Sequence, residues 1–411
     1  MQVIGNIVIY ILMACMMAGC IGAVIRPDKG IGFEFLEGLR QLSTIFIPVA
    51  GVMAALPYMK LMIQAVFTRI SALVGNDIAM WAGILLPPDM GGNLLTYDIS
   101  GSQETWIIAL FTCFILGSGV TYGIPMSINM VDKKDHKYMA MGILCGLMAC
   151  PIGITVSCFL CMLTSPSIRE FVSTVGEPTG SLRLTVSVIA VNLIPVYLIC
   201  GLIGLGMTLM PEKMVKMFLK FGQLLNGTLY IIFGLSVVEY FTGLCSTLWS
   251  GWGFEPIIAD AADYNRALET AGYCALMLAG AYPMMYLLQR FLGERIVKAG
   301  EKLGISELGC LGLIASAVSL VAIFRNYSKM PDIDKVRCIA WSLCGGYFLA
   351  DHLVYCYNYQ PNLYGCLLIG KLAGGICAML LVEVLIKRRL AKGVQNEQTT
   401  VKIYNKQPQN L

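Results

Sequence analysis

Long apolar runs, separated by short polar and basic segments, dominate this chain. Crossing about 30 Å of hydrocarbon takes about 20 helical residues. The runs of that length are Val3–Ile25, Ser43–Phe67, Thr105–Met130, Tyr138–Leu163, Leu184–Met210, Gly222–Gly243, Ala271–Gln289, Arg337–Tyr357 and Pro361–Ile386. Two weaker runs, Ile70–Leu86 and Leu308–Phe324, are shorter. The pattern predicts an all-α polytopic membrane protein embedded in a lipid bilayer.

Similar residues recur in the two halves of the chain at a nearly constant spacing. The matches are Ala55–Pro57 with Ala281–Pro283, Gly75 with Gly304, Gly83 with Gly312, Gly117 with Gly345, and Gly146 with Gly370. Glycine is frequent, at 43 of 411 residues, so the ordered set carries the argument rather than any one match. We expect a duplication in which each half holds about five helical segments, the third being a weak run.

The distribution of basic residues predicts how the two halves are oriented. If both weak runs are re-entrant and the C-terminal tail is inside, most Lys and Arg residues lie on the inner face, as the positive-inside rule requires. Only Lys60, Arg69, Arg169, Arg183 and Arg266 then lie outside, and Lys371 lies within the membrane. Four crossings per half and one linking helix give two inverted-topology repeats, the usual architecture of secondary transporters.

This topology divides the chain into four parts. Residues 1–165 form the first membrane repeat, 166–215 a linking loop and transmembrane helix, 216–390 the second repeat, and 391–411 a cytoplasmic polar tail. The first run lacks a basic n-region and a small-residue cleavage site, so we expect a retained span rather than a signal peptide. The repeated small residues Gly142, Gly146, Gly370 and Gly374 predict close helix packing.

Composition supports the membrane prediction and excludes several functions. The chain is 57% hydrophobic and 13% charged, against about 25% charged in an average soluble domain. Its net charge of +4 comes from loops between spans, which gives no reason to expect nucleic acid as a partner. Cys158 and Cys161 form a C-x-x-C at lipid depth without a neighbouring His or acid, so we expect no metal and reduced thiols. The sequence contains no enzyme motif, so we expect a protein that is not an enzyme and needs no cofactor.

Asp89 is the first candidate for a binding residue. It lies in Pro87-Pro88-Asp89-Met90-Gly91-Gly92, where two prolines and two glycines cannot continue a helix. A carboxylate held at such a break could pair with a substrate ammonium group. The structural alternative is that Asp89 only caps a turn at the outer surface.

Asp351, His352 and Lys371 are candidates because they lie inside apolar runs. Ionisable side chains at that depth face a cavity or a partner, since a bare charge costs several kcal/mol. Lys371 is the natural partner of Asp351, so a purely structural ion pair is the alternative. Glu239 and Glu383 lie near span ends, where they could reach the interface. Asn192 is a further polar residue that could line a path or pack between helices.

The residues taken together resemble the ethanolamine-utilisation permease family (EutH). The likeness rests on an ordered set of segments, namely Asp89–Gly92, Asn192–Val196, Pro211–Met214, Gly280–Met284, Asp351–Leu353 and Gly370–Gly375. The resemblance implies a multi-pass bacterial inner-membrane permease that admits ethanolamine for breakdown in a microcompartment-based pathway. Pro87-Pro88 and the Cys- and Tyr-rich stretch Tyr355–Tyr359 differ from better-known members of the family, and such differences bear on fine substrate preference.

A site for ethanolamine, an ammonium alcohol at neutral pH, needs a carboxylate or aromatic face together with hydrogen-bonding partners for the hydroxyl group. Asp89, Asp351, Tyr282, Asn192 and Asn93 supply these groups, and we expect a facilitator or uniporter of the protonated amine. The alternatives are a carrier of another small polar solute, such as an amino acid or nucleoside, and a non-transporting sensor or enzyme. A homo-oligomer is common among such carriers.

Overall fold

The computed structural model describes residues 2–387, apart from 175, 265 and 350. The N-terminal half contains α1 (Gln2–Ile25), α2 (Gly30–Arg40), α3 (Leu42–Ala54), α4 (Leu56–Val74), α5 (Ala79–Leu85), the kinked turn η1 (Pro88–Gly92), α6 (Asn93–Ile99), α7 (Gln103–Thr112), the π-helical segment η2 (Cys113–Gly123), α8 (Ile124–Met130), the short turn η3 (Lys133–Asp135) and α9 (His136–Thr164). The short strands β1 (Ser167–Ile168) and β2 (Gly180–Ser181) then pair antiparallel.

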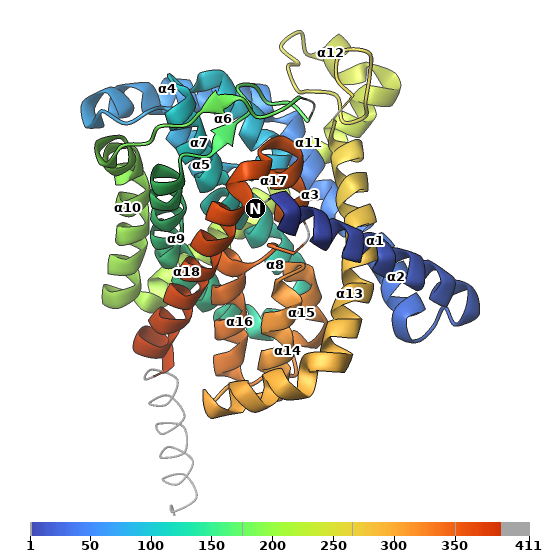
Figure 1. Cartoon of the computed structure of the whole chain (residues 1–411). Coiled ribbons are helices and arrows are strands. Elements are labelled where there is room, and N and C mark those ends of the chain that lie inside the picture. Colours follow the sequence, from blue (N-terminus) through green and yellow to red (C-terminus); the bar gives the residue numbers. More distant parts are fainter. Residues whose placement is uncertain (1, 175, 265, 350, 388–411) are drawn as a thin grey trace, which may run out of the picture.

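The C-terminal half consists, in its described residues, of helices and short turns, with one long loop between Leu248 and Ala267 (Figure 1). Its elements are α10 (Val186–Leu209), α11 (Pro211–Thr242), α12 (Leu244–Leu248), α13 (Ala267–Lys302), α14 (Glu307–Ser316), α15 (Leu320–Tyr327), α16 (Asp332–Gly345), α17 (Asp351–Tyr359), η4 (Pro361–Leu363), α18 (Tyr364–Val382) and η5 (Glu383–Lys387). The predicted cytoplasmic tail, residues 391–411, lies outside the described residues.

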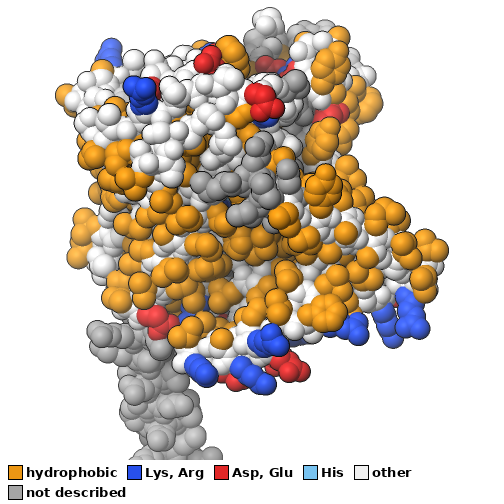
Figure 2. Space-filling model, in the orientation of Figure 1, with side chains coloured by type: hydrophobic (Ala, Val, Ile, Leu, Met, Phe, Trp, Pro, Cys, Tyr) orange, Lys and Arg blue, Asp and Glu red, His pale blue; other side chains and the backbone are white. Residues whose placement is uncertain are grey.

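Six described helical segments are long and apolar enough to cross a bilayer. They are Gln103–Met130, Lys133–Thr164, Val186–Leu209, Pro211–Thr242, Ala267–Lys302 and Pro361–Ile386. The pair Ile9–Ile25 and Gly30–Ala54, bent by 108°, adds at most one more. Figure 2 shows a broad hydrophobic band around this face, with Lys and Arg side chains gathered along its lower edge. The chain is therefore a multi-pass helical membrane protein.

The prediction of nine continuous spans is wrong at two places. The run Ser43–Phe67 is interrupted at Ala55, where α3 ends and α4 begins. Pro57 lies in the first turn of α4. Backbone N–H groups in a first turn have no partner within the helix, so a proline, which has no N–H, loses no hydrogen bond there. In Figure 1, α4 lies across the upper edge of the molecule.

The second interruption falls inside the run Arg337–Tyr357. Helix α16 ends at Gly345 and α17 begins only at Asp351. Tyr347, between them, has a φ of 63°, a left-handed conformation that is rare for a bulky residue. The chain at this depth is therefore a broken helix.

The two weak runs form short helices rather than spans. Ile70–Leu86 is divided at Gly75, whose φ of 83° ends α4 before α5 begins. Leu308–Phe324 divides into α14 and α15, with a turn between Ser316 and Leu320. Helices of ten residues or fewer span at most about 15 Å, so none of these pieces crosses a bilayer alone.

Helix α9 packs directly against α16 and α18 through the glycines that the sequence singled out. A Cβ atom at Gly146 would lie 2.9 Å from the carbonyl oxygen of Ala340, and one at Gly370 would lie 2.5 Å from that of Gly153. Such distances leave no room for a side chain. The prediction of close helix packing is confirmed, and this packing brings η2 next to the break between α16 and α17.

Candidate functional site

Interrupted helices from both halves of the chain meet in the middle of the molecule. In η2, the Ser118 hydroxyl donates to the carbonyl oxygen of Cys113 at 3.0 Å, in the wider turn of a π-helix. On the other side, the backbone N–H groups of Tyr347 and Leu349 donate to the carbonyl oxygens of Ser316 and Ala317, at 2.9 and 2.8 Å. These bonds hold Tyr347 in its strained conformation, and such strain is concentrated at functional sites.

A pocket lies between these breaks and the η1 turn, and the space inside it that a water-sized molecule can occupy is about 20 Å³. That space holds about one water molecule, so the lining side chains close tightly around the pocket in this conformation. The lining residues are Ile45, Val49, Pro87, Asp89, Met90, Ser118, Tyr122, Cys274, Tyr347 and His352. The wall is thus mostly apolar and aromatic, with a few polar groups.

Asp89 supplies the acidic group of this pocket. The η1 turn carries it there because Gly91 adopts a φ of 86°, which bends the chain between α5 and α6. The Cys274 thiol lies 3.9 Å from Oδ2 of Asp89, a weak contact. Lys and Arg are absent from the pocket lining, and Asp89 takes part in none of the ion pairs among the described residues. A carboxylate in such surroundings favours a cation as its partner.

Aromatic rings also line the pocket. The ring centroids of Tyr122 and Tyr347 are 6.1 Å apart, and those of Tyr347 and His352 are 5.0 Å apart. The Phe114 ring packs edge-on against His352 at 5.2 Å. Ring faces attract ammonium groups within about 6 Å, so the pocket offers a carboxylate and aromatic faces to the same ligand.

His352 and Lys371, two of the predicted residues, lie near η2 in different surroundings. Nε2 of His352 is 3.2 Å from Oγ of Ser118, inside the pocket. Lys371 is fully buried and donates to the carbonyl oxygen of Phe114 at 3.3 Å. The side chain of Asp351 lies outside the described residues, so the Asp351–Lys371 pair stays a prediction.

Asn93 lies next to the η1 turn at the start of α6 and is fully buried. Its Oδ1 accepts a hydrogen bond from the indole N–H of Trp106 at 3.0 Å. The amide nitrogen has no hydrogen-bond partner of normal geometry among the described residues. Asn93 therefore supports the turn that carries Asp89.

Asn192 and Tyr282 lie elsewhere. Oδ1 of Asn192 accepts from the backbone N–H of Asp77 at 2.8 Å, which fixes the segment between α4 and α5. The Tyr282 ring lies 5.4 Å from the guanidinium carbon of Arg325. Nη1 of Arg325 also donates to both carboxylate oxygens of Glu34. These three residues line a separate cavity. The structure does not bring Asn192 or Tyr282 into the pocket with Asp89, and their roles in binding stay predictions.

Besides aliphatic and proline side chains, sequence reasoning missed four polar or aromatic lining residues, Ser118, Tyr122, Cys274 and Tyr347. A signal was present for two of them, because Ser118 follows a glycine matched between the halves and Tyr347 follows the Gly345-Gly346 pair. Cys274 has no distinguishing pattern in the sequence. Among the described residues, no cluster of three or more His, Cys, Asp or Glu side chains could hold a metal ion.

The fold and the pocket define a multi-pass helical membrane protein with a small internal cavity built on broken helices. The chain belongs to the family of the ethanolamine utilisation protein EutH, whose model matches residues 4–385. The "Probable ethanolamine permease EutH" of Listeria monocytogenes is 28% identical over 97% of this chain and 99% of its own length. The protein of that name from Salmonella typhimurium is 25% identical over 96% and 98%, respectively. No solved structure matches the chain.

Proposed function

We propose that the protein is a permease that takes up ethanolamine across a bacterial inner membrane and carries the protonated amine. The observation that carries the proposal is the position of Asp89, a carboxylate without an ion-pair partner among the described residues, in a small pocket that aromatic rings also line. Membership of the family and the printed names of the relatives support the same substrate. In this proposal Asp89 binds the ammonium group and Tyr122, Tyr347 and His352 surround it.

The positive charge of protonated ethanolamine favours uniport, which is transport without a coupling ion. A cation gains about 2.3 kcal/mol per 100 mV of inside-negative potential. Since about 1.4 kcal/mol corresponds to a factor of ten, that potential supports roughly fifty-fold accumulation without a coupling ion. We infer that the membrane potential alone drives uptake.

The proposal includes two inverted-topology repeats, residues 1–165 and 216–390, joined by a linking loop and helix at 166–215. Matched glycines support the duplication, since Gly75 and Gly304 both have a positive φ, at 83° and 69°. A Cβ atom at Gly83 would lie 2.6 Å from the carbonyl oxygen of Ala109, and one at Gly312 would lie 2.9 Å from Sγ of Cys338. Ala109 and Cys338 are separated by the same number of residues as the two glycines they contact.

The test is uptake of labelled ethanolamine by proteoliposomes at limiting substrate, with and without an inside-negative potential. Asp89→Asn keeps the size of the side chain and removes its charge. Truncating one member of a desolvated charge pair costs about 2 kcal/mol or more, so we expect uptake to fall at least about thirty-fold. The matched control is Asp98→Asn, which removes an exposed carboxylate paired with Lys60 and should leave uptake within about two-fold.

Two results would contradict the proposal. Normal uptake by Asp89→Asn would remove this carboxylate from the binding site. Absence of ethanolamine uptake by the folded wild-type protein, with saturable uptake of an amino acid or nucleoside, would favour the alternative class of carrier.

A further inference from the structure

The hydrogen bonds around Ser118 determine which nitrogen of His352 carries a proton. A hydroxyl group has a single hydrogen, and that of Ser118 is donated to the carbonyl oxygen of Cys113 at 3.0 Å. Oγ of Ser118 is therefore an acceptor toward Nε2 of His352, 3.2 Å away. Because the ring has no ion-pair partner among the described residues, and burial disfavours an unpaired charge, the imidazole is neutral. Its proton lies on Nε2, and Nδ1 presents a lone pair.

Nδ1 of His352 lacks a hydrogen-bond partner among the described residues. The side chain is 4% exposed, so bulk water does not solvate this lone pair. Leaving a buried acceptor without a donor is unfavourable, yet the ring cannot turn away. It is held by Ser118 at Nε2 and lies between the rings of Tyr347 and Phe114, with centroids 5.0 and 5.2 Å away.

His352 lines the same pocket as Asp89, so the pocket combines a carboxylate with a side chain that carries a neutral acceptor. We propose that Nδ1 of His352 accepts a hydrogen bond from the hydroxyl group of the substrate, so that the pocket selects amino alcohols over simple amines. The inference rests on the proposed function and adds a specificity-determining residue to it. Asp89 binds the ammonium group, and His352 recognises the hydroxyl group at the other end of the molecule.

Two analogues separate this role from general amine binding. Ethylamine keeps the ammonium group and lacks the oxygen. 2-Methoxyethylamine keeps both the ammonium group and the oxygen but has no hydroxyl hydrogen to donate. Since the missing bond leaves Nδ1 without a partner in each case, we expect both analogues to compete about 10- to 100-fold less well than unlabelled ethanolamine.

Variants at His352 sharpen the comparison. The amide nitrogen of a glutamine takes the position of Nε2, so His352→Gln keeps a donor for Ser118 and loses the acceptor at Nδ1. We expect the preference for ethanolamine over 2-methoxyethylamine to fall to within about three-fold in His352→Gln. The oxygen of an asparagine takes the position of Nδ1, so His352→Asn should retain more of the preference. The measurement is the ratio of the concentrations at which ethanolamine and 2-methoxyethylamine compete equally well, and this ratio does not depend on how much protein is active in each preparation.

Ser118→Ala is a second route to the same test. Without the hydroxyl oxygen, the imidazole proton is no longer held on Nε2, and the preference for ethanolamine over 2-methoxyethylamine should fall. If wild-type protein takes up ethanolamine but 2-methoxyethylamine competes equally well, the role of His352 is overturned and the proposed function stands. An unchanged preference in Ser118→Ala would overturn the assignment of the proton. Absence of ethanolamine uptake by wild-type protein would instead overturn the proposed function.

Discussion

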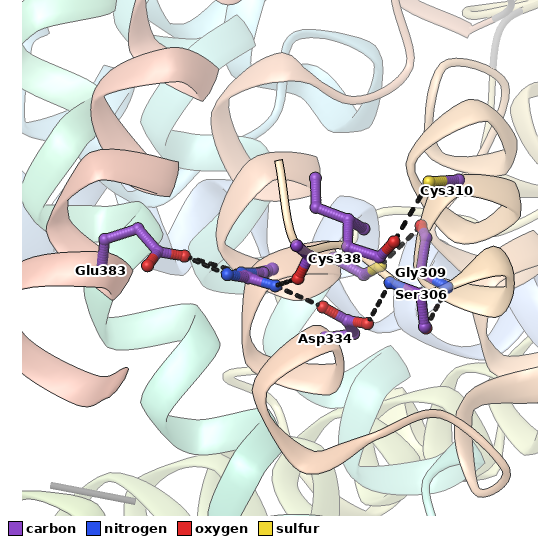
Figure 3. Close-up of polar contacts among 9 residues, drawn as sticks. Ser306, Gly309, Cys310, Asp334, Cys338 and Glu383 are labelled. Carbon is purple, nitrogen blue, oxygen red and sulfur yellow. Dashed lines mark hydrogen bonds and ion pairs between the residues drawn. The ribbon is translucent and has the colours of Figure 1, made fainter. Parts of the chain in front are cut away.

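Arg337 lies at the centre of an ionic network that holds together the ends of three elements in the C-terminal half, and Figure 3 labels two of its partners, Asp334 and Glu383. Its guanidinium donates to Oδ1 of Asp334 at 2.7 Å, to the carbonyl oxygen of Gly304 at 2.7 Å and to Oε1 of Glu383 at 2.8 Å. Oδ2 of Asp334 also accepts from the backbone N–H of Ser306 at 2.9 Å. The network thus joins the starts of α14 and α16 to the end of α18.

Replacing Arg337 by methionine should destabilise the fold strongly. The side chains of Arg337 and Asp334 are each 2% exposed, so the substitution leaves a buried carboxylate without its counter-charge. Breaking a buried pair in this way costs about 3–5 kcal/mol. Glu383 is 33% exposed and is solvated by water when Arg337 is lost, so we expect a total of about 3–4 kcal/mol.

The measurement is equilibrium unfolding of the purified protein in mixed micelles with increasing SDS, followed by tryptophan fluorescence. Arg40→Met is the control, because Arg40 is 60% exposed and its pair with Glu37 should contribute less than about 1 kcal/mol. Arg337→Met combined with Asp334→Leu should recover part of the loss, since no unpaired charge remains between these two positions. Equal effects of Arg337→Met and Arg40→Met would refute the reasoning.

Two further predictions concern backbone packing and the loop that precedes α13. Gly117→Ala should destabilise the protein by about 1–3 kcal/mol in the same unfolding assay, because its Cβ would overlap backbone carbonyl oxygens of the neighbouring segment, whereas Gly227→Ala has open space and should be neutral or slightly stabilising. Hydrogen bonds from the backbone N–H groups of Asp263 and Ala262 lower the pKa of Asp260. These bonds should therefore stabilise the loop fully above about pH 3.9, the ordinary pKa of an aspartate, and this stabilisation should be lost as the pH falls through the lowered pKa. Peptic cleavage of the loop should rise over that interval in wild-type protein, and a pH dependence identical to that of Asp260→Asn would contradict this.

Hydropathy predicted the class of fold well, because the cost of exposing polar backbone to lipid forces long apolar helices. It could not locate the breaks at Ala55 and between Gly345 and Asp351, since the sequence stays apolar across both. The positive φ of Tyr347 depends on a hydrogen bond to Ser316. Such a contact forms only in the folded chain, and local propensity does not encode it.

Charged residues near span ends were the hardest to interpret from sequence. The charge pattern places Arg337 among the basic residues of the predicted inner face, and Glu383 lies near a span end, from which it could reach the interface. The structure instead joins them in a buried network. The sequence shows how many charged residues lie near the end of a span, but it does not show which of these residues become buried between the helices. Asp89 and His352 were easier to find, because each interrupts an otherwise apolar stretch.

The pocket depends on both halves of the chain at once. Asp89 and Ser118 come from the first half, and Tyr347 and His352 come from the second. The proton on Nε2 is fixed by Ser118, so the acceptor that the second half presents is set by a hydroxyl group of the first. A substrate that bonds to Asp89 and His352 together therefore links the two halves. In the proposed binding mode, a movement that separates η2 from α17 would remove the hydrogen bond that fixes the proton on Nε2 and would open the site. Release of the substrate would then be coupled to the relative position of the two halves.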